Sequence, residues 1–532
     1  WYHDPDWKLA NQMIRKPLRQ RALAKSQVSS TASVPAPVGG WNARDPLSLM
    51  KPEDAVILEN WVPRTADITT RKGAAEHLTG VVGRVRTLAS YHSGTVDQLF
   101  ACTDAGIFDA TAAGEVGTAL HPLTHGRCSM INFATAAGAF LYLVNGTDKP
   151  VLYNGTAWSA LDATSTPALT GVPSTELTYI HAFNKRIWFL RSDSLSAYYL
   201  DAGAVGGALT EFPLGQEFLR GGFLVAMYTW TIDGGNGPED YLIFATSEGE
   251  IILYKGTNPN DAAAFTKVGT FYVAAPLGDR CFLRYGSDVL ILTENGAFAL
   301  STVLSAVSAD RSKAISDRIS QAFAFATSSY RQNLGWEAIV HPTENLLLVN
   351  IPVVSESSSV QYVMNTITKR WCKFSGWDAI CWEFFNGELY FGAEGYVAKA
   401  LVGTSDFGRN ITYRAAQAYN YFGQRGRQKH FKLVRLMLYT SSAVGPSIGA
   451  STNYSPEENL SDISLTESIY GKWDTDAWDS ALWGIGAQMQ SNWQSLAVPE
   501  GYAISFRLQI SSNIAEVSWS ATDYVYEVGG VL

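Results

Sequence analysis

One pattern recurs along most of this chain and limits the folds that it can adopt. From about residue 81 to residue 401, a short apolar run is followed by a tight turn and by a second apolar run. Such runs are paired at 99–102 with 107–108, 140–144 with 151–153, 186–190 with 197–200, 241–245 with 251–254, 289–292 with 297–300, 346–349 with 360–364 and 388–391 with 397–399. Two apolar runs joined by a turn, most often one with glycine, predict a β-hairpin.

The spacing of these hairpins predicts how they pack. A hairpin cannot bury both of its faces alone, so neighbouring hairpins must stack on one another. They return about every 40 to 50 residues, which is the period of the blades of a β-propeller. We count about six to seven repeats, interrupted by the stretch 309–324, which predicts a helix. A β-sandwich is the alternative, although it would rarely need so many similar hairpins.

The sequence changes in character after Leu401. The run 431–439 alternates apolar and polar residues, and further strands are expected at 503–510, 517–520 and 524–528. The sequence therefore predicts an all-β protein with a β-propeller over residues 81–405 and a C-terminal β-sandwich-like platform domain over residues 406–532. The segment 39–80 is expected to pack with the C-terminal domain.

Residues 1–38 form a basic arm and a linker. The arm carries six basic residues against Asp4 and Asp6, and Pro17 should kink or divide any helix there. Residues 26–37 are rich in Ser, Ala and Pro and show no core-forming pattern. There are three alternatives for such an arm: it becomes ordered on a neighbouring subunit, it is disordered, or it contacts nucleic acid. The candidate residues of a clamp on a neighbour or an adaptor are Arg15, Lys16, Arg19 and Arg21.

Composition narrows the classes of function. Charged residues make up only 17% of the chain, below the usual quarter, as expected if part of the surface is hidden in an assembly or many short strands are buried. The net charge of -9 argues against nucleic-acid binding by bulk charge. There is no apolar run long enough for a membrane span, and the first residues predict no signal peptide.

The five cysteines lie far apart in the sequence, and none forms a CxxC motif. This spacing predicts reduced, mostly buried thiols in a protein made in the cytosol. Cys372 and Cys381 fall on two apparently neighbouring strands, where the two thiols could meet.

Residues 39–73 carry the most specific motifs. They read GGWNARDPL at 39–47, MKPEDAVILENWVPR at 50–64 and DITTRKG at 67–73. This segment closely resembles the opening of the tail tubular or nozzle proteins of short-tailed bacteriophages (podoviruses), a family that includes tail tubular protein B and is also called packaged-DNA stabilisation proteins. The ending, residues 521–532, is similar to the same family. No catalytic pattern lies in either segment.

The resemblance implies a structural virion protein and not an enzyme. It implies a ring, of six copies, that docks to the head-to-tail adaptor below the portal. This ring retains packaged double-stranded DNA without sequence specificity, conducts it during ejection, and presents its outer surface to tail fibres or spikes. It implies no cofactor, a location in the phage tail, and assembly in the host cytoplasm. The alternative is a tail-associated propeller protein that degrades polysaccharide or binds glycans.

Residues 409–435 are a second candidate site, because they are basic, contain no acidic residue and are interleaved with aromatic residues. Such a patch can bind phosphates without reading bases. A solvated or inter-subunit face is the alternative, since strand alternation places Lys432 and Arg435 on opposite faces. The candidate residues for the DNA channel or for inter-subunit contacts are Arg409, Arg414, Arg425, Arg427, Lys429 and Lys432.

Other patterns are weak as signs of chemistry. His121 and His125, with Cys128 nearby, could begin a metal site on a helix, but Pro122 and Gly126 favour a loop or strand. Trp473, Trp478 and Trp483 recur among acidic residues. A hydrophobic latch explains them better than a sugar platform or a calcium loop, because the glycine and bidentate acid of a calcium loop are missing.

Residues 231–235 start like the Asp-box of sialidase propellers, but the aromatic residue that should follow is missing. We therefore expect a hairpin loop there. No nucleophile elbow or P-loop is present, and no glycine-rich nucleotide loop follows a strand. The sequence predicts no catalytic, metal-binding or cofactor-binding residue.

Overall fold

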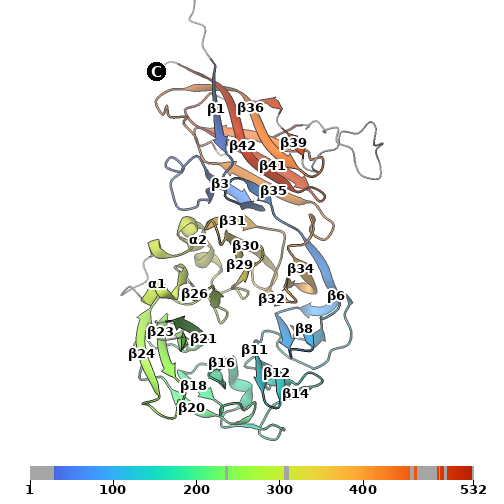
Figure 1. Cartoon of the computed structure of the whole chain (residues 1–532), viewed down its shortest axis with the longest axis vertical. Coiled ribbons are helices and arrows are strands. Elements are labelled where there is room, and N and C mark those ends of the chain that lie inside the picture. Colours follow the sequence, from blue (N-terminus) through green and yellow to red (C-terminus); the bar gives the residue numbers. More distant parts are fainter. Residues whose placement is uncertain are drawn as a thin grey trace, which may run out of the picture.

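The structure is a computed structural model that describes residues 29–233, 238–304, 311–455, 460–463, 488–490, 492–496 and 500–529. It is nearly all β, with 53% strand and 6% helix. Figure 1 shows two units, a circle of small sheets and a sandwich of longer strands, which we call the propeller unit and the sandwich unit. The predicted all-β, propeller-type fold is confirmed.

In the described residues, the propeller unit has seven antiparallel sheets that follow one another along the chain. The first three are β7–β8–β9 (Thr87–His92, Asp97–Thr103, Gly106–Asp109), β11–β12–β13–β14 (Ser129–Thr135, Gly138–Val144, Val151–Tyr153, Trp158–Ala160) and β16–β17–β18–β20 (Leu177–Phe183, Arg186–Arg191, Ser196–Tyr199, Thr210–Pro213). The next two are β21–β22–β23–β24 (Leu224–Asp233, Pro238–Thr246, Glu250–Gly256, Phe265–Tyr272) and β25–β26–β27 (Phe282–Tyr285, Asp288–Thr293, Gly296–Ala299). The last two are β28–β29–β30–β31 (Glu337–His341, Leu346–Val354, Ser358–Asn365, Arg370–Phe374) and β32–β33–β34–β6 (Cys381–Phe385, Glu388–Gly392, Glu394–Ala400, Ala74–Arg84).

The sheets contact one another in chain order, mainly through their first strands. Contacts run from β7 to β11, β16 and β21, then through β26 and β25 to β28 and β32, and from β32 back to β7. Strand β6, which precedes the repeats in the sequence, pairs with β34 of the last sheet. The start and the end of the repeat region are therefore joined by backbone hydrogen bonds, and residue 81 lies inside β6.

Strands of the propeller unit are buried on both faces, which explains their continuous apolar runs. In β8, Leu99 and Ala101 contribute to a core shared with β33 and β34, whereas Phe100 and Cys102 face a core shared with β12 and β13. Alternation along one strand thus fills two inter-sheet cores. The tight turn before β9 needs Gly106, whose φ is +142° and where a Cβ atom would lie 2.6 Å from the His121 carbonyl oxygen.

The sandwich unit combines strands from both ends of the described chain. One sheet holds β1 (Ser30–Pro35), β4 (Trp61–Pro63), β5 (Ile68–Thr70), β36 (Lys429–Thr440), β39 (Gln488–Gln490), β40 (Trp493–Ser495) and β42 (Val517–Val528). The other holds β2 (Gly40–Trp41), β3 (Asp54–Glu59), β35 (Ile411–Gln417), β37 (Ser447–Thr452), β38 (Ser461–Asp462) and β41 (Ile504–Ser512), and continues through β31 into the propeller unit. Buried side chains between the two sheets include Trp61, Tyr413, Phe506 and Trp519.

Two segments differ from the sequence-based expectations. Residues 30–35 of the expected linker form β1, which pairs with β42 and buries Val34. Residues 309 and 310 of the expected helix at 309–324 lie outside the described residues. In the described part, two short 3-10 turns at Arg311–Lys313 and Asp317–Ile319 come first, and the helix α2 (Ser320–Tyr330) begins at Ser320. The reason is that Ile315 donates its backbone N–H to the Ala297 carbonyl of β27, so this stretch follows a strand.

The remaining elements are short. They are α1 (Leu300–Leu304), a 3-10 turn at Ser174–Glu176, β10 (Gly114–Glu115), β15 (Leu169–Thr170) and β19 (Gly207–Ala208). Among the described residues, no helix is long and apolar enough to cross a membrane.

All five cysteines are buried and free, as expected. The suggestion that Cys372 and Cys381 lie on neighbouring strands is wrong. Their strands β31 and β32 belong to different sheets, and their side chains pack in different cores.

Candidate functional site

The first strands of the propeller sheets surround a small cavity, which we call the axial cavity. Its lining comes from β7, β11, β16, β25, β28 and β32, so it lies where these strands converge. Its volume is about 180 Å3, several times the volume of about 30 Å3 that one water occupies in the liquid. Its lining residues are Thr87, Leu88, Cys128, Ser129, Met130, Tyr179, Asp279, Arg280, Phe282, Glu337, Ala338, Trp382 and Glu383.

Arg280 is the cation of the axial cavity. Its Nη1 atom lies 3.2 Å from the Glu337 carboxylate, and its Nη2 atom donates to Thr87 Oγ1 at 2.8 Å. Nη2 also approaches the carbonyl oxygens of Arg86 at 3.1 Å and Cys128 at 3.3 Å. One guanidinium therefore ties together the starts of three first strands.

The carboxyl groups around the cavity have different environments. Burial raises the pKa of Glu383 to about 8, so this side chain is mostly protonated at neutral pH, although Ser90 donates a hydrogen bond to it at 2.8 Å. Burial also raises the pKa of Glu337, against the opposing effect of Arg280. Burial alone would raise the pKa of Asp279, but the positive charges of Arg127 and Arg280 outweigh this effect, so the pKa is lowered.

A larger hollow of about 800 Å3 adjoins the axial cavity and shares Asp279 with it. Its lining includes Arg127, which is paired with Asp279, and Arg331, which is paired with Glu294 at 2.5 Å. Strand starts and turns of several sheets form this lining. Asp279 therefore lines both the hollow and the axial cavity.

The part of the chain that the structure describes holds no group of three or more His, Cys, Asp or Glu side chains able to bind a metal ion. The histidines weighed in the sequence have other neighbours. His125 Nδ1 lies 2.9 Å from Arg86 Nη1, and Cys128 is buried beside the axial cavity. His121 lies in the segment that bridges to Ile107 of β9.

A second cluster of functional interest joins the two units, and we call it the joint. At its centre, the fully buried Arg71 side chain contacts both oxygens of Asp406, at 3.0 and 2.5 Å. The guanidinium also donates to Asn60 Oδ1 at 2.8 Å and to the Ser375 carbonyl at 2.7 Å, and it lies 4.4 Å from the centre of the Trp377 ring. One side chain thereby holds residues from the sandwich unit, from the turn after β31 and from the connection after β34.

Asn60 adds a second set of bonds to the joint. Its backbone is left-handed, with φ of +62°, a conformation that asparagine tolerates better than most residues. Its backbone N–H donates to the Lys373 carbonyl at 2.7 Å, and its side-chain amide donates to the Thr412 carbonyl at 2.8 Å. Asn60 therefore links the edge of the propeller unit to β35 of the sandwich.

The first motif of the opening segment forms a third part of the joint. Asn42 is buried and donates to Asp45 and Asp54, each at 2.9 Å. Arg318, just before α2, contacts the other Asp54 oxygen at 2.5 Å. A Cβ atom on Gly39 would lie 2.5 Å from that same oxygen, so glycine is required for this close packing.

The predicted basic residues at 409–435 are not gathered on one surface. Lys429 is buried, and its Nζ atom donates to three backbone carbonyls, those of Gln424, Arg427 and Tyr502, at 2.7 to 3.0 Å. Burial lowers its pKa. This lysine ties a loop to the sandwich and cannot meet DNA in this structure.

The other five have varied surroundings. Lys432 is paired with Glu527, and Arg414 lies 3.6 Å from Glu59. Arg425 lies over the Tyr421 ring and donates to the Ser48 carbonyl at 2.9 Å. Arg409 and Arg427 are exposed. Their roles in DNA or inter-subunit contact stay predictions.

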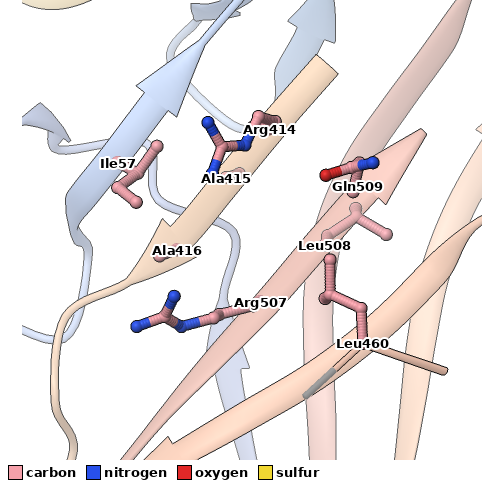
Figure 2. Close-up of a pocket in the computed structure, with 8 residues that line it drawn as sticks. All are labelled: Ile57, Arg414, Ala415, Ala416, Leu460, Arg507, Leu508 and Gln509. Atoms are coloured by element: carbon pink, nitrogen blue, oxygen red, sulfur yellow. The ribbon is translucent and has the colours of Figure 1, made fainter. Parts of the chain in front are cut away.

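Arg414 has a basic neighbour that the sequence analysis missed, Arg507 on β41. The strands β35 and β41 pair so that Ala416 lies opposite Arg507. Figure 2 shows both guanidinium groups extending toward the side of β3 where Ile57 lies. The hollow between them measures only about 20 Å3, so it holds no ligand larger than a water. The alternation of apolar and polar residues at 503–510 predicted the strand β41. Only the pairing of β41 with β35 brings the two arginines onto neighbouring strands.

Several other predicted positions lie outside the described residues. These are Arg15, Lys16, Arg19 and Arg21 of the arm and the three tryptophans Trp473, Trp478 and Trp483. The Asp-box-like sequence starts at the end of β21, and residues 234–237 are likewise outside the described part.

Comparisons with known proteins give no family. No family model and no curated protein matches the chain. Among solved structures, BBS1N in complex with ARL6DN is similar with a TM-score of 0.38 and 9% identity, over 62% of this chain and 96% of that one. The extracellular domain of a putative hybrid two-component system from B. thetaiotaomicron gives a TM-score of 0.37 and 12% identity, over 74% of this chain but only 46% of that one. A putative 6-phosphogluconolactonase from Bacteroides fragilis gives a TM-score of 0.32 and 14% identity, over 62% of this chain and 89% of that one. The function is therefore argued from the residues of this chain.

Proposed function

We propose that this chain is a structural virion protein that forms the tail nozzle of a short-tailed phage. In this role it docks to the adaptor below the portal, retains packaged DNA and conducts it during ejection. The observation that carries the proposal is the place of the segment that resembles the nozzle family. Three of its motif residues, Asn42, Asn60 and Arg71, are buried in the joint between the propeller and sandwich units.

A rigid joint is what a nozzle subunit needs. Force from docking or from DNA under pressure must pass between the two units without changing their angle. The joint uses a bidentate arginine–carboxylate pair, which fixes geometry in two directions, together with backbone bonds from Asn60. A flexible binding module does not need such a rigid joint, because its units can move independently.

Ring assembly follows from cyclic symmetry. One heterologous contact, repeated around an axis, closes a ring. The basic arm at residues 1–25 carries six basic and two acidic residues, and in this proposal it reaches a neighbouring subunit or the adaptor. The exposed Arg409 and Arg427 are the candidates for contact with DNA phosphates.

The proposal is tested by the mass of the assembled protein. Sedimentation of the purified full chain, with and without the adaptor ring, should show an assembly of about six times the 58.0 kDa chain. Deletion of residues 1–25 should impair docking or ring closure while the folded units keep their circular dichroism spectrum. A full chain that stays monomeric with the adaptor present would contradict the nozzle function, and unchanged assembly after the deletion would contradict the clamp role of the arm.

A further inference from the structure

The axial cavity has more polar chemistry than a packed propeller core requires. Two ion pairs, Arg127 with Asp279 and Arg280 with Glu337, and the additional carboxyl group of Glu383 lie at or beside it. Buried charges are costly to maintain, and hydrophobic replacements are often as stable. Arg280 ties first strands together, whereas Glu383 forms no ion pair with any residue that the structure describes. We propose that the axial cavity is a binding site for one neutral sugar unit, held by the carboxyl groups of Glu337, Glu383 and Asp279 and by aromatic side chains.

The charge balance selects a neutral ligand. Within the described residues, the arginines and carboxylates of the two ion pairs cancel, and Glu383 belongs to no ion pair. Burial keeps Glu383 largely protonated at neutral pH. A cationic ligand would face Arg127 and Arg280, and an anionic ligand would face the carboxylates of Asp279 and Glu337. The cavity therefore favours a ligand that is polar but uncharged.

The carboxyl groups retain capacity for further hydrogen bonds. Glu337 accepts from Arg280 at 3.2 Å and from the Trp382 backbone N–H at 3.3 Å, and Asp279 is paired with Arg127. A carboxylate offers about four lone-pair positions, so these contacts do not saturate the group. The Asp279 and Glu337 side chains keep 32% and 17% of their surface accessible, so part of each carboxyl group can be reached by a ligand. Hydroxyl groups both donate and accept hydrogen bonds, so they can pair with carboxylates such as Glu337 and with a protonated carboxyl group such as Glu383.

Aromatic and apolar side chains complete the lining. Tyr179, Phe282 and Trp382 come from three different first strands. Sites for small molecules combine apolar or aromatic walls with a few fixed polar groups, and a sugar presents C–H faces to the walls and hydroxyls to the polar groups. The cavity volume of about 180 Å3 suits a single ring. The adjoining hollow of about 800 Å3 would admit the rest of a glycan.

The inference goes beyond the nozzle proposal and is tested separately. The full chain is titrated with glucose, galactose and mannose and with glucuronic and galacturonic acids, using saturation-transfer NMR and calorimetry at pH 7. We expect at least one neutral hexose to bind with a dissociation constant of about 1–10 mM, as is reasonable for a ligand of this size. The uronic acids should bind at least tenfold more weakly.

Variants assign the binding to the cavity. Glu383→Ala should weaken hexose binding at least tenfold, whereas Glu383→Gln, which keeps the neutral hydrogen-bonding group, should stay within threefold of the unaltered chain. Glu211→Ala, on the exposed face of β20, is the matched control and should change nothing. Circular dichroism confirms that each variant is folded. The inference is overturned if none of the three hexoses binds, if uronic acids bind equally well, or if Glu383→Ala binds normally.

Discussion

Replacing Arg71 by Met is the most informative single change in the joint. Methionine keeps much of the volume of the arginine stem but removes the guanidinium. The substitution deletes both contacts with Asp406 and the hydrogen bonds to Asn60 Oδ1 and the Ser375 carbonyl. Asp406 then keeps its bond from Trp377 Nε1, at 2.9 Å, but has lost its counter-charge.

The Arg71–Asp406 pair is shielded from solvent. The Arg71 side chain has no accessible surface and that of Asp406 has 12%, so solvent cannot replace the lost contacts. Removing one partner of a buried ion pair typically costs about 3–5 kcal/mol, because the other charge stays buried without compensation. We expect Arg71→Met to fall in that range. The double variant Arg71→Met with Asp406→Asn removes both charges and should recover part of the loss.

Urea unfolding followed by tryptophan fluorescence measures this cost, because Trp61 and Trp377 lie in the same core as the joint. The control is the neighbouring pair Lys72 with Glu344, whose side chains are 52% and 32% exposed. Lys72→Met should change the free energy of unfolding by less than about 1 kcal/mol, as exposed ion pairs usually do. If Arg71→Met were no more destabilising than Lys72→Met, the argument that this pair holds the units together would be refuted.

Three further predictions concern the core. The pKa of Glu383 in the folded protein, about 8, is above its ordinary value of 4.5, so between pH 4.5 and pH 8 the folded state binds one proton more than the unfolded state and stability falls as pH rises. Glu383→Gln should remove this pH dependence and stabilise the protein by about 2–4 kcal/mol at pH 8. Urea unfolding at several pH values measures both effects. At Gly73 a Cβ atom would lie 1.9 Å from the Ser405 carbonyl oxygen, so Gly73→Ala should lower the free energy of unfolding by about 1–3 kcal/mol or more. In the control Gly426→Ala, the added Cβ atom meets nothing within 4 Å, so the urea midpoint should change little. A thiol reagent should modify none of the five buried cysteines in the folded protein and all of them in urea; rapid labelling of the folded chain would contradict their burial.

The fold could be predicted largely because its signal is local. Apolar runs such as 140–144 and 151–153 became β12 and β13, since strand alternation and turn residues are written in neighbouring positions. The linker prediction was wrong at 30–35 because the partner of that strand is β42, almost five hundred residues later. Nothing in a Ser- and Ala-rich stretch indicates such a distant pairing.

The candidate sites were harder to predict for the same reason. Arg280, Glu337 and Glu383 are far apart in the sequence and meet only because each lies at or beside the first strand of a different sheet. The basic stretch at 409–435 was visible as composition, but composition does not show that Lys429 turns inward onto three carbonyls. The motif at 67–73 was noticed by resemblance, whereas the burial of Arg71 within it required the structure.

Negative-stain imaging of the full chain, alone and mixed with its adaptor ring, tests the nozzle proposal most directly. A nozzle should appear as a short tube or ring with a central channel that caps the adaptor. Single particles with the size of one chain, showing no association with the adaptor, would contradict it.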